Sequence, residues 1–198
     1  YSNLENVELF FNGTSLGKQH IDLKHGDVLH GCWNVKYRKG TLTAKAYDKN
    51  GKVVADDVMS SFTEPVRIED VPDKTELAAD GRDLIFIEIS VNDEMGIPVA
   101  NARDRIKVTV NGPARLVGLD NGDSTDFESY KNDNKRLFSG KLLAIVQSTL
   151  DIGTITVSFE GDGLSEKMLV FESVECENAV GVSVTDNYYP YLDISTYI

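Results

Sequence analysis

Three histidines and a cysteine are the first residues in this sequence that could bind a metal ion. His20, His25 and His30 follow one another at intervals of five, and Cys32 comes two residues after the last. Zinc prefers four nitrogen and sulfur ligands of this kind. The spacing argues against a shared site, because an odd interval reverses the face of a strand and five residues turn a helix by about 140°. We interpret these side chains as exposed loop or strand residues, and the sequence predicts no metal site.

A run of acidic and turn-forming residues at 120–126 is a second candidate. Its sequence, Asp-Asn-Gly-Asp-Ser-Thr-Asp, could present several oxygens to calcium. The run does not have the alternating acids and sixth-position glycine of an EF-hand loop. Asp and Asn side chains in turns commonly bond to their own backbone. We therefore interpret 120–126 as a turn, with a calcium site as the alternative.

Catalytic arrangements are absent from the sequence. A glycosidase needs two carboxyl groups at a defined separation, one of them with a pKa raised by burial. Of 32 acidic residues, only Glu88 lies inside an apolar strand, and its neighbours predict that it faces solvent. No nucleophile elbow, phosphate-binding glycine loop, dinucleotide fingerprint or His-Glu-x-x-His segment occurs. Cys32 and Cys176 have no recognisable base and are interpreted as buried or free thiols. The sequence thus predicts no catalytic residue, no cofactor-binding residue and no cofactor.

The aromatic residues admit two interpretations. Trp33 is the one tryptophan, and its alternation with Val35 and Tyr37 favours burial in a strand over an exposed ring that stacks on a sugar. Tyrosines also cluster in the acidic tail at 188–197. We interpret that cluster as interface packing, with contact to a sugar or a protein as the alternative.

Composition limits the partners and the size of the framework that positions these residues. The chain has 198 residues, of which 41% are hydrophobic and 26% charged, and this is typical of two soluble globular domains. It is too short for a closed α/β barrel of roughly 250 residues. A formal net charge of −12 argues against nucleic acid and anionic lipid as partners. No apolar run reaches the roughly 18 to 20 residues of a membrane span.

The start of the chain does not reveal its compartment. It begins Tyr-Ser-Asn, without an initiator methionine or a leader sequence. We interpret the chain as processed or as a piece of a longer protein, and its location stays open.

Apolar residues alternate with polar ones in the first part of the chain and predict short antiparallel strands. Residues 7–18 form a predicted hairpin around Asn12-Gly13, a pair that favours a tight turn. Residues 42–55 form a second predicted hairpin. Residues 60–66 are expected to close a small sandwich, and the proline-bounded stretch 66–71 is expected to link or cross to the next module.

The second part has longer strand patterns. Every second residue is apolar in 85–91, 106–110 and 155–159. Turn residues separate these segments, as expected for a second sandwich. The predicted fold class is all-β, with two tandem Ig-like antiparallel β-sandwich domains. We place them at 1–69 and 70–172, with 173–198 as a tail or the start of a further module.

Several segments resemble a known family. Tyr1 to Gly17 is similar to the opening of the β-sandwich domain that follows the catalytic barrel in bacterial glycoside hydrolase family 2 β-galactosidases. Segments within 79–101, 118–123 and 138–159 resemble the next, Ig-like C-terminal domain of those enzymes. The resemblance covers about residues 1–172.

This resemblance implies a parent enzyme that hydrolyses terminal β-linked galactose or a related sugar with retention, using two glutamates in a barrel upstream of Tyr1. It implies that this chain is a non-catalytic C-terminal fragment whose partners are that barrel and other subunits of the parent. Apolar residues are then expected on a face of the first domain that the barrel covers. Two other functions stay open: a carbohydrate-binding module with exposed aromatic residues, and Ig-like repeats of a bacterial surface adhesin.

Overall fold

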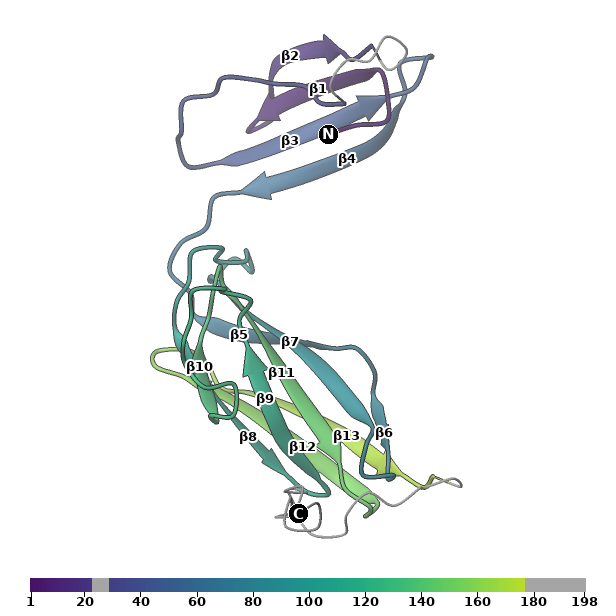
Figure 1. The fold of residues 1–198 in the computed structure, drawn as a ribbon. Helices are drawn as coiled ribbons and strands as arrows, with labels where there is room; N and C mark the ends of the chain where they lie inside the picture. Colours follow the sequence, from purple (N-terminus) through teal and green to yellow (C-terminus); the bar gives the residue numbers. More distant parts are fainter. Residues whose placement is uncertain (23–28, 177–198) are drawn as a thin grey trace, which may run out of the picture. The chain divides into compact units, whose positions relative to one another are not determined.

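The computed structural model describes residues 1–22 and 29–176, and within them thirteen strands and no helix. This confirms the all-β class. The chain divides into two compact units, Tyr1–Phe62 and Thr63–Ile198 (Figure 1). The division falls before the expected boundary at 69, because the 66–71 stretch supplies a strand of unit 2 in place of a linker. The described residues contain no helix long and apolar enough to cross a membrane.

Unit 1 has one four-stranded antiparallel sheet in the order β2-β1-β3-β4. The first predicted hairpin is confirmed as β1 (Asn6–Phe11) and β2 (Thr14–His20). Asn12 and Gly13 have φ values of 47° and 80°, the positive angles that a tight two-residue turn requires. The second predicted hairpin is confirmed as β3 (Thr41–Tyr47) and β4 (Val53–Ser60).

The predicted strand around Trp33 is wrong, because residues 29–39 are irregular. This segment contacts the sheet through side chains. The Trp33 indole N–H donates to the Gly17 carbonyl oxygen over 3.1 Å, and the Gln19 amide bonds to the backbone of Cys32. These contacts reach β2, which is an edge strand, but the segment forms no backbone ladder with it. In place of a second sheet, the described part of unit 1 has this irregular segment.

Unit 2 is a β-sandwich, as predicted. One sheet has the order β5-β7-β11-β9 and the other the order β10-β8-β12-β13-β6. Its pairings are antiparallel except that between β6 and β13. The strands are β5 (Arg67–Pro72), β6 (Glu76–Ala78), β7 (Leu84–Asn92), β8 (Arg105–Asn111), β9 (Ala114–Asp120), β10 (Asn134–Arg136), β11 (Lys141–Ser148), β12 (Gly153–Gly161) and β13 (Lys167–Val174).

The core of unit 2 confirms the predicted alternation on β7, β8 and β12. The fully buried side chains include Ile85, Ile87, Ile89 and Val91 on β7, Ile106 and Val108 on β8, and Ile155, Val157 and Phe159 on β12. They fill the space between the two sheets, and each gives up its hydration shell on folding.

The observed strand limits differ from the predicted ones at 60–66 and at 172. The closing strand expected at 60–66 is wrong, since β4 ends at Ser60 and the next strand starts at Arg67. β13 continues to Val174, past the expected domain limit at 172. The remainder of the expected tail, 177–198, lies outside the described residues.

Candidate functional site

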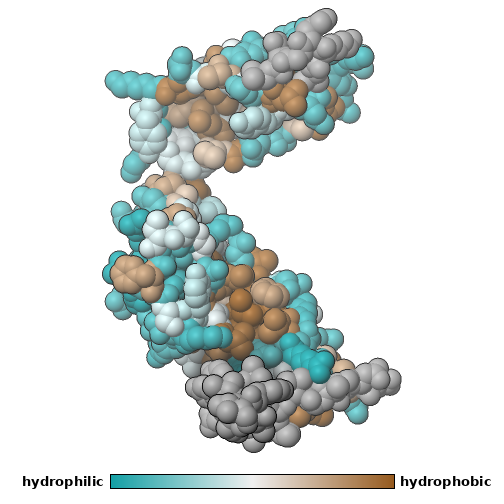
Figure 2. Space-filling view, viewed as in Figure 1, coloured by the Kyte–Doolittle hydropathy of each residue, from teal (hydrophilic) through white to brown (hydrophobic). Residues whose placement is uncertain are grey.

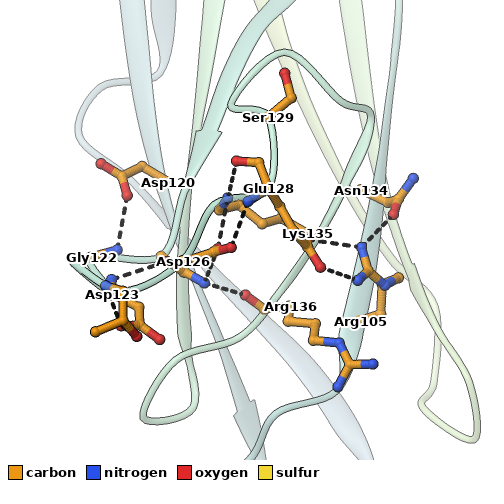
Figure 3. A network of polar contacts seen from close by, with 12 residues as sticks. Arg105, Asp120, Gly122, Asp123, Asp126, Glu128, Ser129, Asn134, Lys135 and Arg136 are labelled. Atoms are coloured by element: carbon orange, nitrogen blue, oxygen red, sulfur yellow. Dashed lines mark hydrogen bonds and ion pairs between the residues drawn. The ribbon is translucent and has the colours of Figure 1, made fainter.

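The acidic run at 120–126 lies at the start of the connection between β9 and β10 (Figure 3). Its side chains bond to nearby backbone. Asp120 Oδ1 accepts the Gly122 N–H over 2.9 Å, and Asn121 Oδ1 accepts the Asp123 N–H over 3.0 Å. Asp123 Oδ1 accepts the N–H two residues further on, over 2.9 Å. These are Asx turns, so the interpretation of this run as a turn is confirmed.

Lys135 anchors this connection from within. Its side chain is 1% exposed, and its Nζ donates to Asp126 Oδ2 over 2.8 Å and to the Glu128 carbonyl oxygen over 3.0 Å. The ammonium lies 4.9 Å from the centre of the Tyr130 ring. A buried charge is costly unless it is paired and hydrogen-bonded. These contacts therefore hold the acidic connection against β10.

A second ion pair joins the same connection to β8. The Arg105 guanidinium donates to both carboxylate oxygens of Glu128 and to Asn134 Oδ1, the last over 2.8 Å. The hydrogen bond from Lys135 lowers the pKa of Asp126, and that from Arg105 lowers the pKa of Glu128. Both carboxyl groups are therefore ionised at neutral pH. Neither has the raised pKa that the acid of a glycosidase needs.

The part of the chain that the structure describes contains no cluster of side chains that could bind a metal ion. No three His, Cys, Asp or Glu side chains lie together there as a metal site requires. The oxygens of Asp120, Asp123 and Asp126 named above already accept hydrogen bonds from their own loop or from Lys135. The calcium alternative thus gains no support from residues 120–126.

The described histidines do not form a common site. His20 is exposed at the end of β2, and the ring of His30 meets the Tyr1 ring edge-on with their centres 5.5 Å apart. His25 lies outside the described residues. Because the structure describes only two of the three, the predicted absence of a site at these histidines stays a prediction.

The remaining chemical candidates are separate from one another. Cys32 is exposed and Cys176 partly exposed, and both are free thiols. Glu88 on β7 forms an ion pair with Lys141 on β11, and both side chains are more than half exposed. This confirms the solvent-facing position predicted for Glu88.

Unit 1 has an open groove that the sequence analysis did not predict. It has a volume of about 340 Å³, and its lining includes Phe11, Tyr37, Arg38 and Met59. Trp33, predicted to be buried in a strand, is only half-buried and lines an adjoining depression. The basic and aromatic run at 36–39 is the signal that could have indicated this groove.

Comparison with protein families matches both parts of the chain. Residues 68–170 match the family described as glycoside hydrolase family 2 C-terminal domain 5. Residues 1–55 match a domain of unknown function, DUF4982.

Two curated relatives cover most of the chain. It is 34% identical over 175 residues to the β-galactosidase BoGH2A of Bacteroides ovatus, which is 88% of this chain and 20% of that protein. It is 29% identical over 169 residues to a putative β-glucuronidase of Formosa agariphila, which is 82% of this chain and 16% of that protein. The chain thus spans a fifth or less of the length of these relatives.

Solved structures share the arrangement of strands. A β-glycosidase from Bacteroides vulgatus superposes with a TM-score of 0.80 at 35% identity, over 87% of this chain and 22% of that chain. A glycosyl hydrolase family 2 member from Bacteroides cellulosilyticus gives a TM-score of 0.80 at 31% identity, over 88% of this chain and 22% of that chain.

Proposed function

Because the chain belongs to the glycoside hydrolase family 2 C-terminal domain 5 family, we propose that it serves as the non-catalytic accessory part of a larger β-glycosidase. The parent hydrolyses terminal β-linked galactose or a related sugar, an assignment that the similarity to the Bacteroides ovatus β-galactosidase supports. The reacting carboxyl groups then belong to the remainder of the parent. The two units act as supports that contact that remainder.

The observation that carries this proposal is the apolar surface of β4. This strand lies at the edge of the unit 1 sheet, and Val53, Val54 and Val58 are exposed by 41, 51 and 54%. An exposed apolar edge strand invites pairing or burial against another surface. Figure 2 shows apolar side chains beside hydrophilic ones on the visible surface of this unit. We assign the face of β4 that carries Val58 as a contact with the catalytic barrel or another subunit of the parent.

A single substitution tests this contact. Val58→Lys places a charge on β4 at a position that is already exposed, so the thermal midpoint of the 198-residue chain should not change. In the full-length parent the same substitution should lower the midpoint, because the charge enters a buried contact.

Asn50→Lys in the exposed turn before β4 is the matched control and should affect neither protein. An unchanged midpoint of the parent carrying Val58→Lys would contradict the assignment of β4 as an interface. Equal destabilisation of the chain and the parent would also contradict it.

A further inference from the structure

The groove in unit 1 has a cationic rim in an acidic protein. Lys36 and Arg38 line the groove, and Lys39 follows them in the chain. All three are exposed, and no carboxylate pairs with them within residues 1–22 and 29–176. The whole chain has a net charge of −12 and 32 acidic residues. Three cations without an acidic partner in such a chain leave a local site for an anionic group.

Arg38 is held in position while its donors stay available. Its guanidinium carbon lies over the Phe11 ring, 4.1 Å from the ring centre, and this cation–π contact restrains the side chain. Its N–H groups donate no hydrogen bond to another described residue. A guanidinium held in this way presents a planar pair of donors that matches the two oxygens of a carboxylate.

The groove beside Arg38 suits a sugar ring in size and lining. Its volume of about 340 Å³ lies within the range of small-ligand sites, roughly 300 to 1,000 Å³. Its lining combines apolar Phe11, Leu42 and Met59 with Tyr37, whose side chain is 80% exposed. An exposed aromatic ring can stack on the apolar face of a sugar while its hydroxyl stays in water.

We propose that this groove, between Tyr37 and Met59 in unit 1, binds an oligosaccharide that carries a uronic acid. The carboxylate pairs with Arg38, and the sugar ring stacks on Tyr37. A long polyanion would meet the repulsion of the whole acidic chain. A single carboxylate on an otherwise neutral sugar experiences mainly the nearby cations, because salt screens charges beyond about 8 to 10 Å. The site does not depend on the accessory role proposed above, because Met59, which lines the groove, alternates with Val58 along β4 and faces the other side of the strand.

Nuclear magnetic resonance titration of the 198-residue chain tests the proposal. The probe is cellobiouronic acid, a glucuronic acid linked to glucose, and the comparison ligands are cellobiose and the peptide Gly-Glu-Gly. We expect saturable shifts of backbone amides in 35–42 and 59–62, with cellobiouronic acid binding about tenfold more tightly than either comparison ligand. Absence of saturable shifts in these segments overturns the proposal. Equal binding of cellobiose removes the role of the carboxylate, and equal binding of the peptide makes the site one for acidic peptides; either result also overturns it.

Substitutions separate the two contacts. Tyr37→Ala and Arg38→Gln should each weaken binding of cellobiouronic acid about fivefold or more, because each removes one named contact. Phe127→Ala, at a 99% exposed aromatic residue of unit 2, and Lys49→Gln, at a turn of unit 1, are matched controls that should leave binding unchanged. Circular dichroism confirms that each variant is folded. Unchanged binding in either folded test variant overturns the assignment of that contact, and unchanged binding in both overturns the site.

Discussion

Replacement of Lys135 by methionine tests whether the buried ion pair stabilises unit 2. Methionine keeps a flexible apolar chain of similar length but removes the ammonium that donates to Asp126 and to the Glu128 carbonyl oxygen. Asp126 keeps two other donors, the Asn121 amide over 3.0 Å and the Glu128 N–H over 2.8 Å. The substitution therefore removes the charge partner without leaving the carboxylate bare.

The expected loss follows from the burial of the lysine. Removal of one partner of a buried pair costs about 3 to 5 kcal/mol of unfolding free energy. Because the other partner keeps two hydrogen bonds, we expect Lys135→Met to cost about 3 kcal/mol, the lower end of that range. For a domain of this size the melting temperature should fall by roughly 10 °C.

Guanidinium unfolding followed by circular dichroism measures this change. Lys131→Met is the matched control, because Lys131 lies in the same connection but is exposed and donates to the Val117 carbonyl oxygen. It should cost less than about 1 kcal/mol. The double variant Lys135→Met with Asp126→Asn should lose less than the sum of the two single losses, since the two side chains interact. Equal losses for Lys135→Met and Lys131→Met would refute the reasoning.

Three other perturbations have expected outcomes. Phe159→Ala should reduce the unfolding free energy by about 3 to 5 kcal/mol in a denaturant titration, because Phe159 is fully buried between the sheets. Gly112→Ala should cost about 2 kcal/mol or more in the same assay, since Gly112 has φ 98° and a Cβ would collide with the Thr154 carbonyl oxygen. Lowered folded-state pKa values of Asp126 and Glu128 stabilise the fold above their ordinary values of 3.8 and 4.5, so the melting temperature should drop as pH falls through the lower folded-state values.

Controls separate these effects from general sensitivity to substitution. Phe127→Ala should leave stability nearly unchanged because the ring is exposed. Gly122→Ala, at φ 73° with open space around the added Cβ, should cost less than Gly112→Ala. Lys135→Met should reduce the acid sensitivity, because the pKa of Asp126 would then lie closer to its ordinary value. A loss of unfolding free energy in Phe127→Ala or Gly122→Ala equal to that of its test variant would contradict the packing explanation. An unaltered dependence of the melting temperature on pH in Lys135→Met would contradict the electrostatic one.

Turn propensity and the alternation of apolar residues were sufficient to predict the hairpins and the long strands from the sequence. The turn at Asn12-Gly13 depends on backbone angles that these two residues adopt readily, so neighbouring sequence determines it. On β7 the two-residue alternation and the burial pattern agree because one face packs on the core along the whole strand.

Non-local contacts explain what the sequence did not predict. Val35 and Tyr37 alternate like a strand, but side chains connect their segment to the edge strand β2, and the segment forms no backbone ladder with it. Lys135 stands among polar residues that resemble a solvated loop, and its burial depends on Asp126, a partner brought to it by the fold. The groove at Tyr37 likewise depends on β1, β3 and β4 beneath the segment, which no local pattern reveals.

The activity of the purified 198-residue chain most directly tests the claim that it is a non-catalytic part of a larger enzyme. Nitrophenyl β-galactoside and nitrophenyl β-glucuronide are suitable substrates. The account predicts no product release above that of buffer from either one. Turnover that persists through repurification in proportion to the amount of this chain would contradict the claim.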